Sequence, residues 1–169
     1  MTVLNGTDVE GLKDYVDGVA TDPSKADRDL LVTAHWEGES RARVEKEGSK
    51  ALYIGGGDEL SAMAGILGML AACDVEVVAT HATLLGLELK DLRVEARGQF
   101  NLATLLGVDA PHDAGYQQIA YTVVIDAPNA TDEQIAYLKE RCERSSPVGD
   151  TLRKQVPLTL EFVNEAGGS

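Results

Sequence analysis

The segment from Asp58 to about Leu85 constrains the fold of this chain more than any other. It contains no proline, and Ala, Leu, Met, Val and Gly occupy most of its positions. We expect a long helix here, with Asp58 as its N-cap. Apolar residues cover nearly the whole circumference between Leu60 and Ala72, which is typical of a helix buried on all sides rather than lying on a surface.

A chain of 169 residues and 18.0 kDa has the size of one domain, and we predict a single domain, residues 1–169. Such a chain has difficulty surrounding one of its own helices completely. We therefore expect the helix to lie in the interface of a homodimer. Gly65 and Gly68 each cost about 1 kcal/mol relative to Ala inside a helix, which indicates that another backbone approaches closely there.

The residues before this segment predict a short helix followed by strands. The helix is expected at about residues 7–20, with Asn5 or Thr7 as its cap. Alternation of apolar and polar residues then predicts three strands, joined as an antiparallel meander, within residues 29–38, 40–48 and 50–57.

The residues after the long segment predict a hairpin, a helix and a closing strand. The hairpin has strands within 89–102 and 116–128, and the helix covers 129–145 with Thr131 as its cap. Residues 154–163 are expected to form the last strand of a core that spans about residues 29–164. Helices and strands are grouped rather than alternating, so the fold class is α+β.

The charge of the chain excludes some partners. Its 28 acidic and 15 basic residues give a net charge of −13, whereas binding to nucleic acid or to anionic membranes needs a basic surface. No stretch reaches the roughly 18 apolar residues of a spanning helix, so we expect no membrane association. The N-terminus MTVLNGTDVEGL lacks the features of a signal peptide, and we expect a cytoplasmic protein.

The two cysteines are the candidate reactive groups. Cys73 lies in the long helix, far from its positive end, so a thiolate there needs a cation from elsewhere in the chain. The segment SRARV offers Arg41 and Arg43. From the residues alone, Cys73 is either a nucleophile or a small apolar core residue, and Cys142 is either its partner thiol or part of the apolar face of its own helix. The three histidines are scattered along the chain, and we expect neither a metal site nor a cofactor.

The order of the motifs resembles that of the OsmC/Ohr family of osmotically inducible and organic hydroperoxide resistance proteins. The resemblance covers nearly the whole chain and rests on NGTDVEGL, a strand meander, a glycine-rich turn, LAAC within the long helix, GLELKDLRVEARGQF, and a helix that runs into SPVGDTLRKQVPL. It implies an intertwined homodimer, in which the long central helices pack together beneath curved antiparallel sheets.

The resemblance also implies a chemistry. Active members reduce hydroperoxides with a peroxidatic cysteine on the central helix, a resolving cysteine before the Pro-Val pair, and an activating Arg/Glu pair. Cys73 falls on the peroxidatic position, whereas Ser146 occupies the resolving position and cannot form a disulfide. Met63 or Ala64 replaces the glutamate at the helix start, so no carboxylate is expected to orient an arginine.

The arginine position is less clear. Glu39 aligns with it, although Arg41 and Arg43 lie close by in the chain.

We therefore expect a stress-response protein in which thiol-dependent hydroperoxide reduction at Cys73 is weak or altered. Cys142, one helical turn before Ser146, could supply the resolving thiol, or a small thiol reductant could do so. The alternative is a protein without catalysis that holds a lipophilic small molecule in the dimer cleft.

Overall fold

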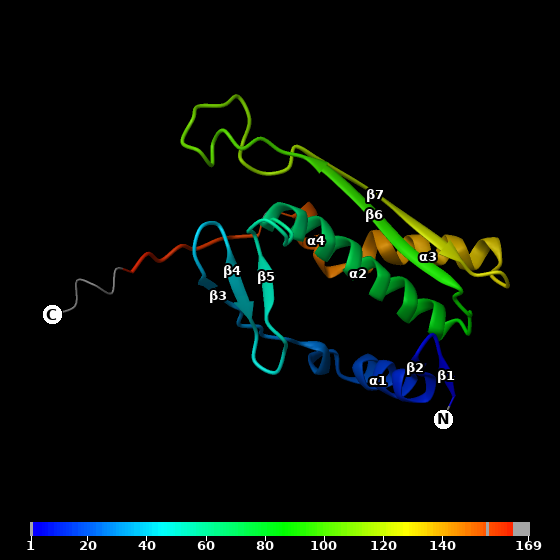
Figure 1. The fold of residues 1–169 in the computed structure, drawn as a ribbon. Helices are drawn as coiled ribbons and strands as arrows, with labels where there is room; N and C mark the ends of the chain where they lie inside the picture. The colour runs from blue at the N-terminus through cyan, green and yellow to red at the C-terminus, as the bar shows by residue number, and fades with distance from the viewer. Residues whose placement is uncertain (1, 155, 164–169) are drawn as a thin grey trace.

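The structure is a computed structural model that describes residues 2–154 and 156–163. Helix α2 runs through the middle of the molecule, with the β6–β7 hairpin along one side and α1 at the opposite edge (Figure 1). Grouped helices and antiparallel sheets confirm the α+β class. The elements are β1 Val3–Leu4, β2 Thr7–Asp8, α1 Val9–Thr21, the 3₁₀ helix η1 Pro23–Ala26, β3 Thr33–Trp36, β4 Ala42–Glu45, β5 Leu52–Ile54, α2 Ala62–Leu84, β6 Asp91–Gln99, β7 Gln118–Asp126, α3 Asp132–Ser145 and α4 Pro147–Arg153.

Helix α2 begins later than the sequence predicts. Its N-cap is Ser61, whose hydroxyl accepts a hydrogen bond from the Ala64 N–H at 3.2 Å, so the expectation of Asp58 is wrong. The residues before Ser61 form a turn instead, closed by a hydrogen bond from the Gly55 N–H to the Leu60 carbonyl at 2.8 Å. Gly55 has φ +79° and packs against the backbone of Ser40, where a Cβ would collide.

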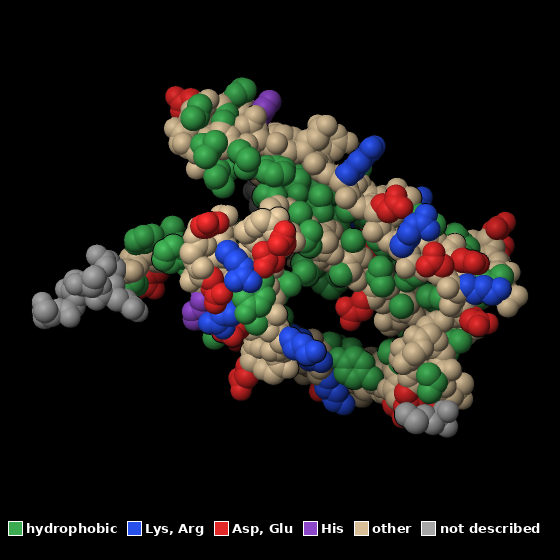
Figure 2. Space-filling view, in the orientation of Figure 1, with side chains coloured by type: hydrophobic (Ala, Val, Ile, Leu, Met, Phe, Trp, Pro, Cys, Tyr) green, Lys and Arg blue, Asp and Glu red, His purple; other side chains and the backbone are tan. Residues whose placement is uncertain are grey.

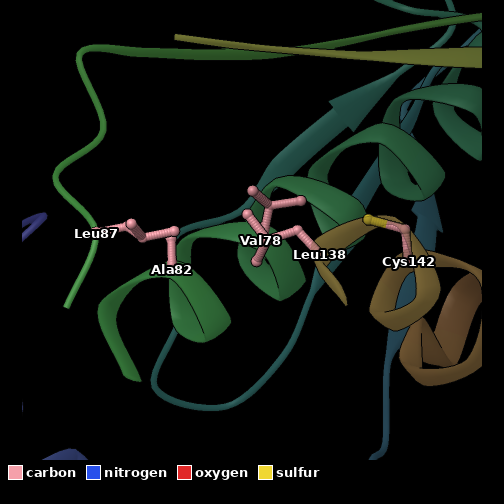
Figure 3. Packing of buried hydrophobic residues seen from close by; sticks show 5 residues of the cluster. All are labelled: Val78, Ala82, Leu87, Leu138 and Cys142. Atoms are coloured by element: carbon pink, nitrogen blue, oxygen red, sulfur yellow. The ribbon is translucent and has the colours of Figure 1, made fainter. Parts of the chain in front are cut away.

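The buried core joins α2 to α3. Val78, Ala82, Leu87, Leu138 and Cys142 form one cluster, in which the Cys142 sulfur points toward α2 (Figure 3). Full burial of an aliphatic side chain contributes about 1.5–3 kcal/mol, so this contact holds α3 firmly on α2. Half-buried apolar residues from the hairpin extend the cluster, among them Leu92, Val123 and Ile125.

The predicted antiparallel sheets are confirmed. Strands β3, β4 and β5 form the expected meander, and β6 pairs with β7 from Asp91 opposite Asp126 to Gln99 opposite Gln118. Alternate residues of β6, including Leu92 and Val94, are half-buried, and this strand packs on α2.

The N-terminal turn is attached to the end of α2 by Asn5. The Asn5 amide donates to the Thr83 hydroxyl at 3.1 Å and to the Leu87 carbonyl at 2.9 Å, and it accepts from the Leu89 N–H at 2.9 Å. Neither Asn5 nor Thr7 caps α1, because the N-cap is Asp8. Asn5 instead adopts φ +50° within the small β1–β2 turn.

Helix α3 has the predicted start. Thr131 and Gln134 exchange reciprocal hydrogen bonds in a capping box, which confirms Thr131 as the cap. Farther along, the Tyr137 hydroxyl lies 3.1 Å from His81 Nδ1 on α2, and the Arg141 guanidinium lies 5.2 Å from the Tyr137 ring centre. Burial and the Arg141 charge both lower the pKa of His81. The contact between Tyr137 and His81 joins α3 to α2, and Arg141 packs on Tyr137 within α3.

The C-terminal segment differs from the prediction. Residues 147–153, to which the prediction assigned no element, form α4, and the described residues 154 and 156–163 form no strand. Leu158, Leu160 and Phe162 alternate along this segment and are 94%, 86% and 91% exposed. A strand needs a neighbour to accept its backbone hydrogen bonds, and the described chain places none beside this segment. The predicted end of the core at residue 164 lies outside the described residues.

Helix α2 is long and apolar enough to span a membrane by length and composition, so the expectation that no segment meets this criterion is wrong. Its middle carries the buried Asp74, and its sides pack against β6 and α3. The core helix of a protein can accommodate a buried ionisable residue, whereas a helix that faces lipid rarely contains one. We interpret α2 as the core helix of a globular protein.

One chain does not bury α2 on all sides. Ile66 is 37% exposed and Met69 is 49% exposed, one helical turn apart on the same face. A Cβ added at Gly68 would meet no atom within 4 Å outside its own helical turn, so no other described segment of the chain approaches there. Hydrophobic side chains gather around a hollow between the hairpin side of the molecule and α1 (Figure 2).

Candidate functional site

Cys73 and Ser146 are in direct contact. The Ser146 hydroxyl lies 3.4 Å from Cys73 Sγ and is placed to donate to it. Ser146 is also the N-cap of α4, since its Oγ accepts from the Gly149 N–H at 3.2 Å. The capping role and full burial leave the Ser146 hydroxyl little freedom. Cys73 itself is only partly buried, in contrast to the fully buried Ser146.

Cys142 has a different environment from Cys73. It lies one turn before Ser146 and is 5% exposed. Burial, and then the nearby Asp74 charge, raise the pKa of its thiol to about 11. Both cysteines are free thiols in the structure. Because the thiolate is the nucleophile, Cys142 is almost entirely in its unreactive form near neutral pH.

Asp74 directly follows Cys73 in the sequence, which did not predict the burial of its side chain. It is fully buried, and neither carboxylate oxygen has a hydrogen-bond partner among the described residues. After burial, the Asp74 charge is the next cause of the raised pKa of Tyr121, as it is for Cys142, so this side chain lies near both. Asp74 and Glu76 are the two acidic residues of α2, and an acid within an otherwise apolar helix is the sequence signal that could have indicated a buried carboxyl.

Arg41 is held by carboxylates at the start of α2. Its Nε donates to Glu59 Oε1 at 3.0 Å, and its Nη1 pairs with Glu37 at 3.2 Å. Its guanidinium lies 4.2 Å from the centre of the Tyr53 ring. The hydrogen bond to Glu59 is the main cause of its raised pKa. The expectation that no carboxylate orients an arginine is therefore wrong, because Glu59 does so from outside the expected positions.

Arg43 is paired within its own sheet. Its Nε donates to Glu37 at 2.8 Å, it also forms an ion pair with Glu45, and these hydrogen bonds raise its pKa. Neither Arg43 nor Arg41 contacts Cys73 in the described part of the chain. Cys73 lies eleven residues after Ala62, the first residue of α2, which corresponds to about 16 Å along the helix axis. One chain therefore does not bring either candidate arginine to Cys73.

The described residues contain no group of three or more His, Cys, Asp or Glu side chains arranged to hold a metal ion. His35 lies 3.6 Å from Glu45 on the meander, whereas His81 contacts Tyr137 on α3. The chemistry that this site can perform with its own groups is that of a thiol beside a hydroxyl.

Comparison with known proteins identifies a family and solved structures that are similar to most of this chain. The family model described as OsmC-like protein matches residues 55–161, well over half of the chain. No curated protein matches the sequence significantly. The solved OsmC-like protein of Mycoplasma pneumoniae has 17% identity and a TM-score of 0.63, over 75% of this chain and 89% of its own.

Two further solved structures carry hydroperoxide resistance in their descriptions. An organic hydroperoxide resistance protein OsmC from Legionella pneumophila has 15% identity and a TM-score of 0.53, over 76% of this chain and 91% of its own. An organic hydroperoxide resistance protein from Elizabethkingia anophelis has 14% identity and a TM-score of 0.53, with the same coverage of 76% and 91%. At these identities the similarity shows the fold.

The two thiols should differ in reactivity toward iodoacetamide. At pH 8, a thiol with a pKa of about 11 is ionised in about one molecule in a thousand, so the buried Cys142 should react far more slowly than the partly buried Cys73. Mass spectrometry of peptides from the alkylated native protein measures both rates. In guanidinium chloride, which unfolds the chain, the two rates should become similar. Equal rates in the native protein at pH 8 would contradict this assignment.

Proposed function

The chain belongs to the OsmC-like protein family, and we propose that it reduces hydroperoxides with Cys73 as its single reactive cysteine. The observation that carries the proposal is the contact between Cys73, a partly buried residue of the central helix, and the Ser146 hydroxyl, which lies 3.4 Å from its sulfur. Solved structures described as organic hydroperoxide resistance proteins share its fold. A stress-response role agrees with this family membership.

The proposed reaction begins at the Cys73 sulfur. The thiolate attacks one peroxide oxygen, the O–O bond breaks, and the other oxygen leaves as an alcohol after taking a proton. Cys73 then carries a sulfenic acid. A small thiol attacks this sulfur, giving a mixed disulfide and water, and a second thiol releases Cys73 as the small disulfide forms. The Ser146 hydroxyl supports the first step by donating a hydrogen bond to the developing thiolate.

An external thiol suits this site better than Cys142. Ser146, not Cys142, is the residue in contact with Cys73. The Cys142 thiol is buried with a pKa of about 11, which leaves little thiolate to attack a sulfenic acid. Two free cysteines and a thiol reductant fit a reducing compartment, which supports the cytoplasm as its location.

The proposed reactive form is a homodimer. The exposed apolar residues of one chain form surfaces that a monomer would not maintain in water. Ile66 and Met69 expose one face of α2, and Leu158, Leu160 and Phe162 form an extended segment with period-two alternation. A second copy would cover the helix face and supply a sheet edge for the extended segment.

Crossing of the two central helices near Gly68 would complete the site. Small residues allow close approach of helices, and Gly68 has open space beside it in one chain. If a two-fold axis passes near Gly68 and the helices are antiparallel, Cys73 lies opposite residue 63 of the partner. That is the end of α2 where Arg41 and Glu59 form their ion pair. We infer that Arg41 activates Cys73 across the dimer.

The assignment predicts which variants lose peroxide consumption. Cys73→Ser should reduce the rate to that of buffer, because the nucleophile is absent, whereas Cys142→Ser should change it by less than roughly twofold. Arg41→Gln should lower the rate about tenfold, the effect of one pKa unit on the thiolate fraction. The measurement is consumption of cumene hydroperoxide with monothiol or dithiol reductants. Arg93→Gln, on the exposed face of β6, is the control.

Activity that persists in Cys73→Ser would contradict the proposal. Activity lost in Cys142→Ser with the fold intact would instead make Cys142 the resolving thiol.

The variant Ser146→Cys should convert the protein to two-cysteine chemistry. The present separation of 3.4 Å between Ser146 Oγ and Cys73 Sγ needs only a small shift to reach the S–S bond length of about 2.05 Å. One equivalent of peroxide should give an intramolecular disulfide, detected by intact mass and by loss of free thiols. Ser146→Cys combined with Cys142→Ser should still form it. A mutant that remains fully reduced would show that the two positions cannot bond.

A measurement of the molar mass in solution tests the proposed homodimer directly. Light scattering of the wild-type chain should give twice 18.0 kDa at micromolar concentration. Met69→Glu places a charge on the exposed apolar face of α2 and should shift the mass to that of the monomer. Met69→Leu keeps the face apolar and should remain dimeric. A wild-type mass of 18.0 kDa would overturn the dimer and the activation by Arg41 of the partner.

A further inference from the structure

A cavity of about 560 Å³ lies between α3 and β7, on the Cys142 side of the molecule. This volume falls within the range of about 300–1,000 Å³ that is usual for small-molecule sites. Neither Cys73 nor Ser146 lines it, although its Arg153 side adjoins the Ser146 hydroxyl next to Gly149. Its walls are mainly apolar and come from α2, β7 and α3 through Val78, Val123, Ile125, Ile135 and Leu138.

Arg153 provides a fixed cation at one end of this cavity. Its Nη1 donates to the Glu143 carbonyl at 3.0 Å, and its Nη2 donates to the Tyr121 hydroxyl at 3.2 Å. A guanidinium has five N–H donors, so further donors remain for a ligand. Within residues 2–154 and 156–163, no carboxylate is paired with Arg153. The guanidinium is thus held in position without its charge being neutralised by an acid of the described chain.

The remaining charged groups favour an anion at the rim. Lys139 and Glu143 line the cavity, are largely exposed, and lie 3.9 Å apart as an ion pair. Together with Arg153 they give the rim a net charge of +1, although the chain as a whole carries −13. The walls away from these charged groups are mainly apolar, through residues such as Val78, Val123 and Leu138. An anionic group is therefore best placed beside Arg153, with an apolar group reaching inward.

We propose that this cavity binds a single-chain amphiphile with a terminal carboxylate, such as a fatty acid. The alkyl chain lies among Val78, Val123 and Leu138, and the carboxylate accepts hydrogen bonds from Arg153 with Lys139 nearby. A neutral lipophile would use the walls but not the cation, and a cationic one would be repelled. The inference does not rest on the chemistry of Cys73.

The test compares head groups on one alkyl chain. Calorimetric titration of the full chain with dodecanoate and dodecyltrimethylammonium below their micelle concentrations, and with dodecanol below its solubility limit, should show dodecanoate binding about tenfold more tightly than dodecanol. Arg153→Gln should weaken dodecanoate about tenfold and leave dodecanol unchanged. Arg144→Gln is the matched control, because Arg144 is exposed, lies on the same helix as Lys139 and pairs with Glu140 outside the cavity.

Cys142 gives a second, independent readout. Its thiol lines the cavity, so bound dodecanoate should slow its modification by methyl methanethiosulfonate and leave the rate at Cys73 unchanged. If Arg153→Gln fails to fold by circular dichroism, Lys139→Gln, at an exposed position, takes its place with a smaller loss of affinity. Equal affinity for the three head groups, equal effects of Arg153→Gln and Arg144→Gln, or no binding would overturn the proposal. No binding is also the outcome if a second copy of the chain fills the cavity.

Discussion

Helix α2 can be shielded from water only by contacts on every face, because apolar residues surround it between Leu60 and Ala72. The β6–β7 hairpin covers one side, and α3 covers another through the cluster of Val78, Leu138 and Cys142. The face with Ile66 and Met69 stays exposed in one chain. The positions of α3, α4 and the hairpin all follow from packing on this helix, and the uncovered face is the basis of the proposed dimer.

The same packing gives the two cysteines opposite properties. Helix α3 lies along α2, and the capped start of α4 brings the Ser146 hydroxyl to Cys73. Cys142, one turn earlier, points into the apolar contact and has a raised pKa. Two thiols of similar intrinsic acidity thus become a partly accessible one and a buried one. The charge of the nearby Asp74 is the second cause, after burial, of the raised pKa of Cys142.

Elements with strong local signals could be predicted, whereas those that depend on distant residues could not. Thr131 and Gln134 lie close in sequence, so the capping box was predictable. The Arg41–Glu59 pair joins residues eighteen positions apart across a glycine turn, and alignment of the helix start alone missed it. The segment with Leu158 and Phe162 has the pattern of a strand, yet the pairing that makes a strand requires a neighbour that one chain does not provide.

The sequence by itself determined the fold class, the long apolar helix, the antiparallel hairpin and the candidacy of Cys73, because periodicity, capping residues and motif order are properties of the chain. Only the tertiary structure decided that Ser146 touches Cys73, that Cys142 is buried, that Glu59 holds Arg41, and that Arg153 lies unpaired with any acid of the described chain beside an apolar cavity. Burial, pKa and ion pairing depend on which distant side chains the packing brings together, and no local pattern contains that information.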